Sequence, residues 1–332
     1  MEKIGIMANA DERLFPPLEP YDNGLLPVGD GHEIYWEQCG NPDGLPVLFF
    51  HGGPGSGCNA RQRRFFHPQR YRIVLFDQRG SGRSRPLGEA AHNATAHLLA
   101  DIERLRAMLA IDRWLVFGGS WGSSLAVAYA AAHPAAVRGM ILRGIFLTGR
   151  RDLEWFFLGL RELLPDAWQR FAALAPKRHR RRLLQYYARR LAADDADGAL
   201  QAAAAWSDYE RAAIAVLPGD ALPAQTPGPA LVAKYRVQAH YLARQCFLGE
   251  TTLLRLAAGC RGIPTAILHG RLDLVCRPVN ALRLQRAISG SRLRFVAGAG
   301  HSPFDEPMAA ALVEATNHFA DHGSFAGWGK RL

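Results

Sequence analysis

Cysteine is scarce in this sequence, and long hydrophobic runs are missing altogether. The 332 residues include five cysteines, an odd number, and no two of them form a C-x-x-C pair. Neither a disulfide framework nor a structural zinc site is therefore predicted. No apolar segment reaches the roughly 20 residues that a membrane-spanning helix needs, so we expect no membrane association.

An apolar leader is also missing from the first residues, MEKIGIMANADERLFPP, so we expect no secretory signal and a cytoplasmic location. Acidic residues are outnumbered, since 40 Lys and Arg face 30 Asp and Glu, for a net charge of +10. Part of this excess lies in KRHRRRLLQYYARR, residues 177–190. We interpret it as a solvated helix face rather than a nucleic-acid-binding surface, because a strong enzyme signature lies elsewhere in the chain.

Short apolar segments alternate with amphipathic ones, which predicts an α/β fold with a mostly parallel sheet flanked by helices. Residues 12–30 are expected to form an extended arm, and 32–39 an edge strand of an antiparallel start. The expected buried strands are 46–50, 72–77, 114–117, 138–147, 264–269 and 293–297, and the expected helices between them include 95–109, 278–288 and 307–321.

The alternation stops for more than a hundred residues in the middle of the chain. Residues 148–258 carry helical patterns alone, which predicts an inserted all-helical cap domain. Residues 1–147 and 259–332 are then expected to form one catalytic domain.

The segment LVFGGSWGSSLAVAYA, residues 115–130, contains a G-x-S-x-G pattern between a strand and a helix. In this context the serine, Ser120, lies on a sharp turn that exposes its hydroxyl above the sheet. Glycines at 118 and 122 allow the close approach of strand and helix that such a turn requires. The pattern predicts a nucleophile, although a Gly/Ser turn that merely joins two elements has the same sequence.

Two further polar residues follow later strands of the predicted sheet. Asp273 lies in HGRLD and His301 in GAGHS, each within about five residues of a strand's carboxyl end. A lone Asp there is often a turn former and a lone His often structural. Ser120, Asp273 and His301 in this chain order match the triad of the α/β-hydrolases, in which His is the base and Asp orients it.

The sequence HGGPG, residues 51–55, follows the first buried strand. Its glycines let the backbone approach a ligand closely. We predict an oxyanion hole formed by the N–H groups of Gly53 and Trp121. A phosphate-binding loop is the competing interpretation, but no Walker lysine follows.

Taken together, these motifs resemble the bacterial proline iminopeptidase family over roughly residues 15–320. The segments that carry the resemblance are HGGPG, DQRGSGRS, ADIERLR, GGSWGSSLAVAYA, LRGIFL, EWF, PDAW, HGRLDLVC and GAGHS. The resemblance implies an α/β-hydrolase with a helical cap, a serine exopeptidase that releases N-terminal proline from small peptides. It implies no cofactor and no metal.

The resemblance also implies residues that bind the substrate. Glu210, in a W-x-x-x-E segment, corresponds to a cap glutamate that pairs with the N-terminal amine. Gln238 stands where the family has a second glutamate, in R-I-E-x-H-Y. Phe146 and Cys276 match positions of the pocket that holds the proline ring.

Gln238 leaves a second interpretation open. A related esterase or amidase, acting on a small metabolite or on another N-terminal residue, would not need two carboxylates. A third class, a non-catalytic or nucleic-acid-binding protein, is disfavoured by the triad residues. The oligomeric state is not predicted from the sequence.

Overall fold

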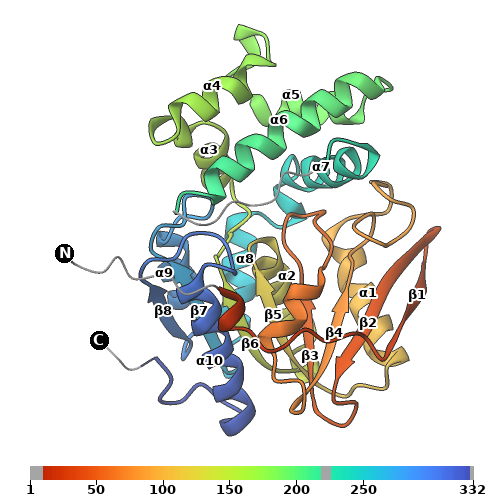
Figure 1. Cartoon of the computed structure of the whole chain (residues 1–332), viewed down its shortest axis with the longest axis vertical. Coiled ribbons are helices and arrows are strands. Elements are labelled where there is room, and N and C mark those ends of the chain that lie inside the picture. The colour runs from red at the N-terminus through yellow and green to blue at the C-terminus, as the bar shows by residue number, and fades with distance from the viewer. Residues whose placement is uncertain (1–9, 218–225, 330–332) are drawn as a thin grey trace.

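An eight-stranded, mostly parallel β-sheet forms the centre of the molecule (Figure 1). The computed structural model describes residues 10–217 and 226–329. The strand order is β1-β2-β4-β3-β5-β6-β7-β8; the pairs β1–β2 and β2–β4 are antiparallel and the others parallel. The strands are β1 (Asp22–Gly29), β2 (His32–Gly40), β3 (Leu45–Phe50), β4 (Tyr71–Phe76), β5 (Trp114–Gly119), β6 (Val137–Arg143), β7 (Thr265–Gly270) and β8 (Arg292–Val296). The predicted fold class is confirmed.

Helices cover both faces of this sheet, and side chains of the inner strands alternate between two hydrophobic clusters. In β3, Leu48 and Phe50 belong to one cluster, whereas Val47 and Phe49 belong to the other. Successive strand side chains point to opposite faces, so a strand covered on both is apolar throughout. The first cluster includes α1 (Thr95–Met108), α2 (Trp121–Ala132), α8 (Gly249–Gly259) and α9 (Val279–Ala287), and the second includes α10 (Glu306–His322).

Helices α3 to α7 form a separate layer at one end of the sheet (Figure 1). The ring of Phe171 stacks on Tyr187 and Tyr209, with centroids 4.3 and 4.5 Å apart. These rings belong to the same hydrophobic cluster as the face of the sheet that α2 covers. The helices of this layer are α3 (Arg150–Phe157), α4 (Pro165–Ala173), α5 (Leu183–Ala192), α6 (Ala196–Ile214) and α7 (Pro229–Leu242). Short 3₁₀ segments are η1 (Ala10–Glu12), η2 (Ala60–Phe65), η3 (Pro134–Ala136), η4 (Gly159–Glu162), η5 (Lys177–His179) and η6 (Gln245–Phe247).

Helix α8 packs against α2 and α9 beside the sheet. The sequence-based boundary counts α8 with the cap, residues 148–258. Because of these contacts, we propose instead that the helical cap runs from about residue 148 to 248 and that α8 belongs to the catalytic domain. The predicted outer bounds, residues 1 and 332, lie outside the described residues, as does the segment 218–225. No helix in the described ranges is both long and apolar enough to cross a bilayer.

Two elements differ from the sequence-based expectation. The expected arm, 12–30, contains the edge strand β1, so β2 lies inside the sheet. Strand β6 ends at Arg143 rather than at Leu147. Gly144 has a φ of +57°, and the N–H groups of Ile145 and Leu147 donate to the side chains of His269 and Asp152 instead of to backbone carbonyls of a neighbouring strand.

Candidate active site

Ser120 stands at the junction between β5, the central strand, and α2. Its backbone has φ 56° and ψ −124°, a conformation that non-glycine residues rarely adopt. The Ser120 N–H donates to the Arg143 carbonyl at 2.9 Å, which ties the turn to β6. A Cβ on Gly118 would collide with the carbonyl of Gly122, and one on Gly122 with the carbonyl of Phe50. Strand and helix are therefore packed backbone to backbone around the serine.

This close packing makes a stability prediction. Gly122→Ala is expected to lower the free energy of unfolding by about 3 kcal/mol, or to prevent folding, because the backbone of β3 must move to admit the methyl group. Gly259→Ala is the matched control, since Gly259 lies in a helix with nothing within 4 Å of its would-be Cβ. Urea unfolding measures both. Equal unfolding midpoints for the two variants would contradict the prediction.

The side chains of His301 and Asp273 form a hydrogen-bonded pair. The His301 Nδ1 atom lies 2.8 Å from Asp273 Oδ2, and Asp273 Oδ1 accepts the N–H groups of Val275 and Cys276 at 3.0 and 2.8 Å. Burial alone would raise the pKa of Asp273, but the neighbouring imidazoles and these hydrogen bonds hold that pKa below its usual value. A carboxylate there requires a proton on Nδ1 of His301, which leaves Nε2 free to act as a base.

Two residues that the sequence did not single out position this pair. The Arg143 guanidinium donates from Nη1 to the His301 carbonyl at 2.6 Å. His269 Nδ1 accepts the Ile145 N–H, so its proton lies on Nε2, which contacts the Cys276 carbonyl at 2.8 Å. Burial lowers the pKa of His269, so it stays neutral beside Asp273. The sequence could have indicated His269, because it is a polar residue in the otherwise apolar strand PTAILH.

The HGGPG loop is held by a network that also involves the first residue of α2. The Trp121 indole N–H donates to Gln78 Oε1 at 2.8 Å. Gln78 in turn donates its side-chain amide to the His51 carbonyl at 3.0 Å and its backbone N–H to His51 Nε2 at 2.9 Å. Because Nε2 accepts, the proton of His51 lies on Nδ1, which contacts the Gly52 carbonyl at 2.9 Å. Burial lowers the pKa of His51, which keeps this ring neutral.

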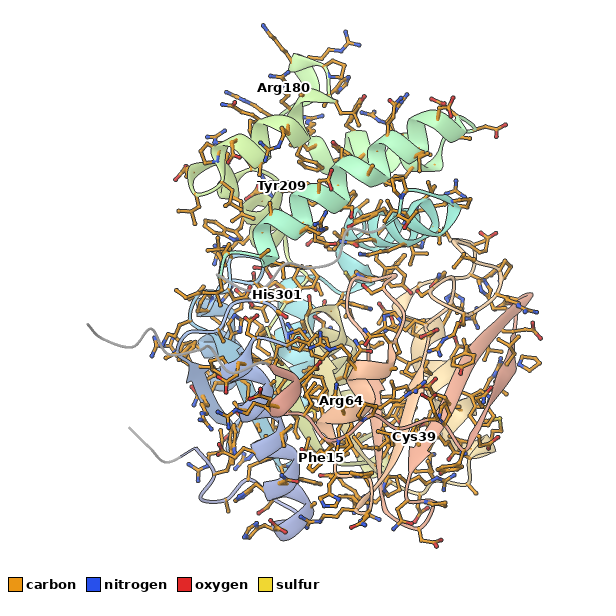
Figure 2. The ribbon with its side chains drawn as sticks, in the orientation of Figure 1. Phe15, Cys39, Arg64, Arg180, Tyr209 and His301 are labelled. Atoms are coloured by element: carbon orange, nitrogen blue, oxygen red, sulfur yellow. The ribbon has the colours of Figure 1, made fainter. Side chains whose placement is uncertain are left out.

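One cavity of about 260 Å³ brings most of the predicted site residues together. Figure 2 shows His301 between the sheet and the cap helices. Asp273 and Trp121 are buried and do not line the cavity; Asp273 contacts His301 at its Nδ1 atom. The predicted residues that line it are Gly53, Ser120, Phe146, Glu210, Gln238, Cys276 and His301.

The cap side of this cavity carries Glu210 from α6 and Gln238 from α7. The Gln238 Nε2 group donates to Glu210 Oε1 at 2.8 Å, and the Tyr235 hydroxyl donates to Glu210 Oε2 at 2.8 Å. The sequence did not single out Tyr235. Burial strongly raises the pKa of the Tyr235 phenol, so it remains a neutral donor.

Phe146 and Cys276 contribute apolar surface to the same cavity, together with Phe156. Burial strongly raises the pKa of the Cys276 thiol. A neutral thiol is a weak nucleophile, so Cys276 is suited to a wall rather than to covalent chemistry.

Among the described residues, one group of three has the spacing of metal ligands: Asp30, His92 and His97, whose ligand atoms lie within 4.8 Å of one another. None of them lines the cavity. Asp30 already pairs with Arg79 at 3.2 Å.

Comparisons with known proteins show the family and the fold of this chain. A family model described as alpha/beta hydrolase fold matches residues 46–307. A proline iminopeptidase of Xylella fastidiosa is 47% identical over 309 residues, which cover 92% of this chain and 99% of that protein. One from Xanthomonas citri is 46% identical over 92% of this chain and 99% of that protein. One from Arabidopsis thaliana is 42% identical over 91% of this chain and 80% of that protein.

Solved structures support the fold alone. The structure of VinJ superposes with a TM-score of 0.60 at 20% identity, covering 91% of this chain and 99% of that one. The esterase RhEst1 from Rhodococcus superposes with a TM-score of 0.55 at 19% identity, covering 92% of this chain and 99% of that one.

Proposed function

Since this chain belongs to the proline iminopeptidase family of α/β-hydrolases, we propose that it releases N-terminal proline from small peptides through an ester formed on Ser120. The observation that carries this proposal is a single cavity lined by Ser120 and His301 on the sheet side and by Glu210 on the cap side. A nucleophile and base at one end and an anionic acceptor at the other suit a short substrate with a free amine.

In the proposed reaction, Ser120 Oγ bonds to the carbonyl carbon of proline while its proton passes to His301 Nε2. Asp273 holds the imidazole in the required tautomer and stabilises its charged form. The oxyanion of the tetrahedral intermediate accepts N–H groups from Gly53 and Trp121. The C–N bond then breaks, and the shortened peptide leaves with the proton.

Water completes the cycle. It adds to the ester carbonyl as His301 takes its proton, the bond to Ser120 breaks, and the serine oxygen recovers that proton. Free proline leaves.

The amine and the ring of the substrate's proline are recognised by different residues of the cavity. A prolyl ammonium carries two N–H donors, and we propose that Glu210 accepts one and the Gln238 amide oxygen the other. Phe146 and Cys276 provide apolar surface for the ring. We propose that the cap helices block the space beyond the amine and so limit cleavage to the first peptide bond. We also propose a cytoplasmic location, in keeping with the five free cysteines.

The wild-type protein tests this function directly. Prolyl anilide is expected to be hydrolysed with a kcat/KM on the order of a hundredfold above that of N-acetylprolyl anilide, because acetylation removes both N–H donors that Glu210 and Gln238 are proposed to accept. Release of the anilide chromophore measures both. Equal hydrolysis of the two would favour the second candidate, an esterase or amidase that needs no free amine, for which the neutral Gln238 is the supporting observation.

A further inference from the structure

A lysine lies beside the carboxylate that is proposed to receive the substrate amine. Lys234, on α7, lines the same cavity as Glu210, and its Nζ atom is 3.5 Å from Glu210 Oε2. The ammonium also stands 4.8 Å from the centre of the Tyr235 ring. The side chains of Lys234 and Glu210 are 17% and 16% exposed, so solvent weakens this ion pair less than it would at the surface.

The rest of this acceptor group is uncharged. Gln238 must present its NH₂ group to Glu210, because the opposite orientation would set its carbonyl oxygen against a carboxylate oxygen. That orientation leaves Gln238 Oε1 as an acceptor, and it has no hydrogen-bond partner among the described residues. Gln238 is only 2% exposed and lines the cavity, so a donor on the substrate is the natural partner of this atom.

Counting formal charges, Glu210 contributes −1, Lys234 +1 and Gln238 none. The amine end of the cavity is therefore neutral before the substrate arrives. A prolyl ammonium that contacts Glu210 must share that carboxylate with Lys234 or displace it, and two cations around one carboxylate repel each other.

We propose that Lys234 determines specificity: it is a built-in counter-ion of Glu210 that weakens the preference of this cavity for a charged N-terminus. Recognition of the amine then depends on the hydrogen-bonding geometry of Glu210 and Gln238 more than on net charge. The inference rests on the proposed function, because it takes the substrate amine to lie at Glu210.

The test replaces Lys234 with methionine, which keeps most of the apolar stem and removes the charge. Two substrates are compared: prolyl anilide and cyclopentanecarbonyl anilide, which has a ring of the same size and no amine. Lys234→Met is expected to lower the KM for prolyl anilide by about tenfold with kcat within about twofold, and to leave the KM for the neutral analogue unchanged. Lys234→Arg keeps the charge, so its KM for prolyl anilide is expected to stay well above that of Lys234→Met.

Lys177→Met is the matched control, since Lys177 is exposed on η5 outside the cavity and its loss should alter neither KM. An unchanged or raised KM for prolyl anilide in Lys234→Met, or equal shifts for both substrates, would overturn the inference while leaving the proposed function in place. If Lys234→Met does not fold, Lys234→Gln is assayed in the same way. A wild-type enzyme that hydrolyses both anilides equally, or neither, would overturn the proposed function and this inference together.

Discussion

Ser120→Ala is expected to reduce kcat for prolyl anilide by about a millionfold, the scale seen when a triad nucleophile is removed. The hydroxyl is the atom that forms the ester, and no neighbouring group replaces it: burial strongly raises the pKa of the Cys276 thiol, which shares the cavity. A serine-directed phosphonate should add its mass to the wild type and not to the variant. Anilide hydrolysis and intact mass measure the two effects.

The fold should survive this change, because alanine and serine meet the same backbone requirement at a φ of 56°. Ser291→Ala is the control; Ser291 caps a turn through Ile288 and should remain dispensable for labelling. Phosphonate labelling of Ser120→Ala, or more than a thousandth of wild-type activity as an order-of-magnitude limit, would mean that another residue is the nucleophile.

The sheet was predictable because its inner strands are apolar on both faces, as in LVFGG, and because helices separate them. The strand β1 was missed, since Pro27 and the polar residues around it are typical of an arm. Proline is tolerated at this place because β1 is the edge strand and its ladder is already irregular between Pro27 and Gly29. The edge position of β1 depends on the order of strands in the sheet, which cannot be read from the local sequence.

The candidate catalytic residues could be predicted for a related reason. Parallel strands end at the same edge of a sheet, so Ser120 and His301, 181 positions apart in the numbering, were expected to meet, and both line one cavity. Arg143 and Gln78 were not predicted, because their roles depend on hydrogen bonds to segments that lie far away in the sequence. The sequence could have predicted that Lys234 lies near Gln238. It precedes Gln238 by four residues, so the two side chains share one face of a helix.

Asp273→Asn is expected to lower kcat by about ten-thousandfold, and the hydrogen bonds explain why. Oδ1 of Asp273 accepts two backbone N–H groups, from Val275 and Cys276, so the amide oxygen of asparagine must take that place. Its NH₂ group then replaces Oδ2 and donates to His301 Nδ1. The imidazole is forced into the tautomer that carries its proton on Nε2, and it can no longer accept the proton of Ser120.

Rotation of the asparagine amide cannot easily relieve this reversal. It would set the NH₂ group against two backbone N–H donors in a buried position. Asp208→Asn, on the exposed face of α6, is the matched control and should keep full activity. Steady-state kcat measures the loss, and ¹⁵N chemical shifts of the His301 ring report the tautomer. A variant within about a hundredfold of wild type, or one whose ring keeps its proton on Nδ1, would show that Asp273 does not set the state of the base.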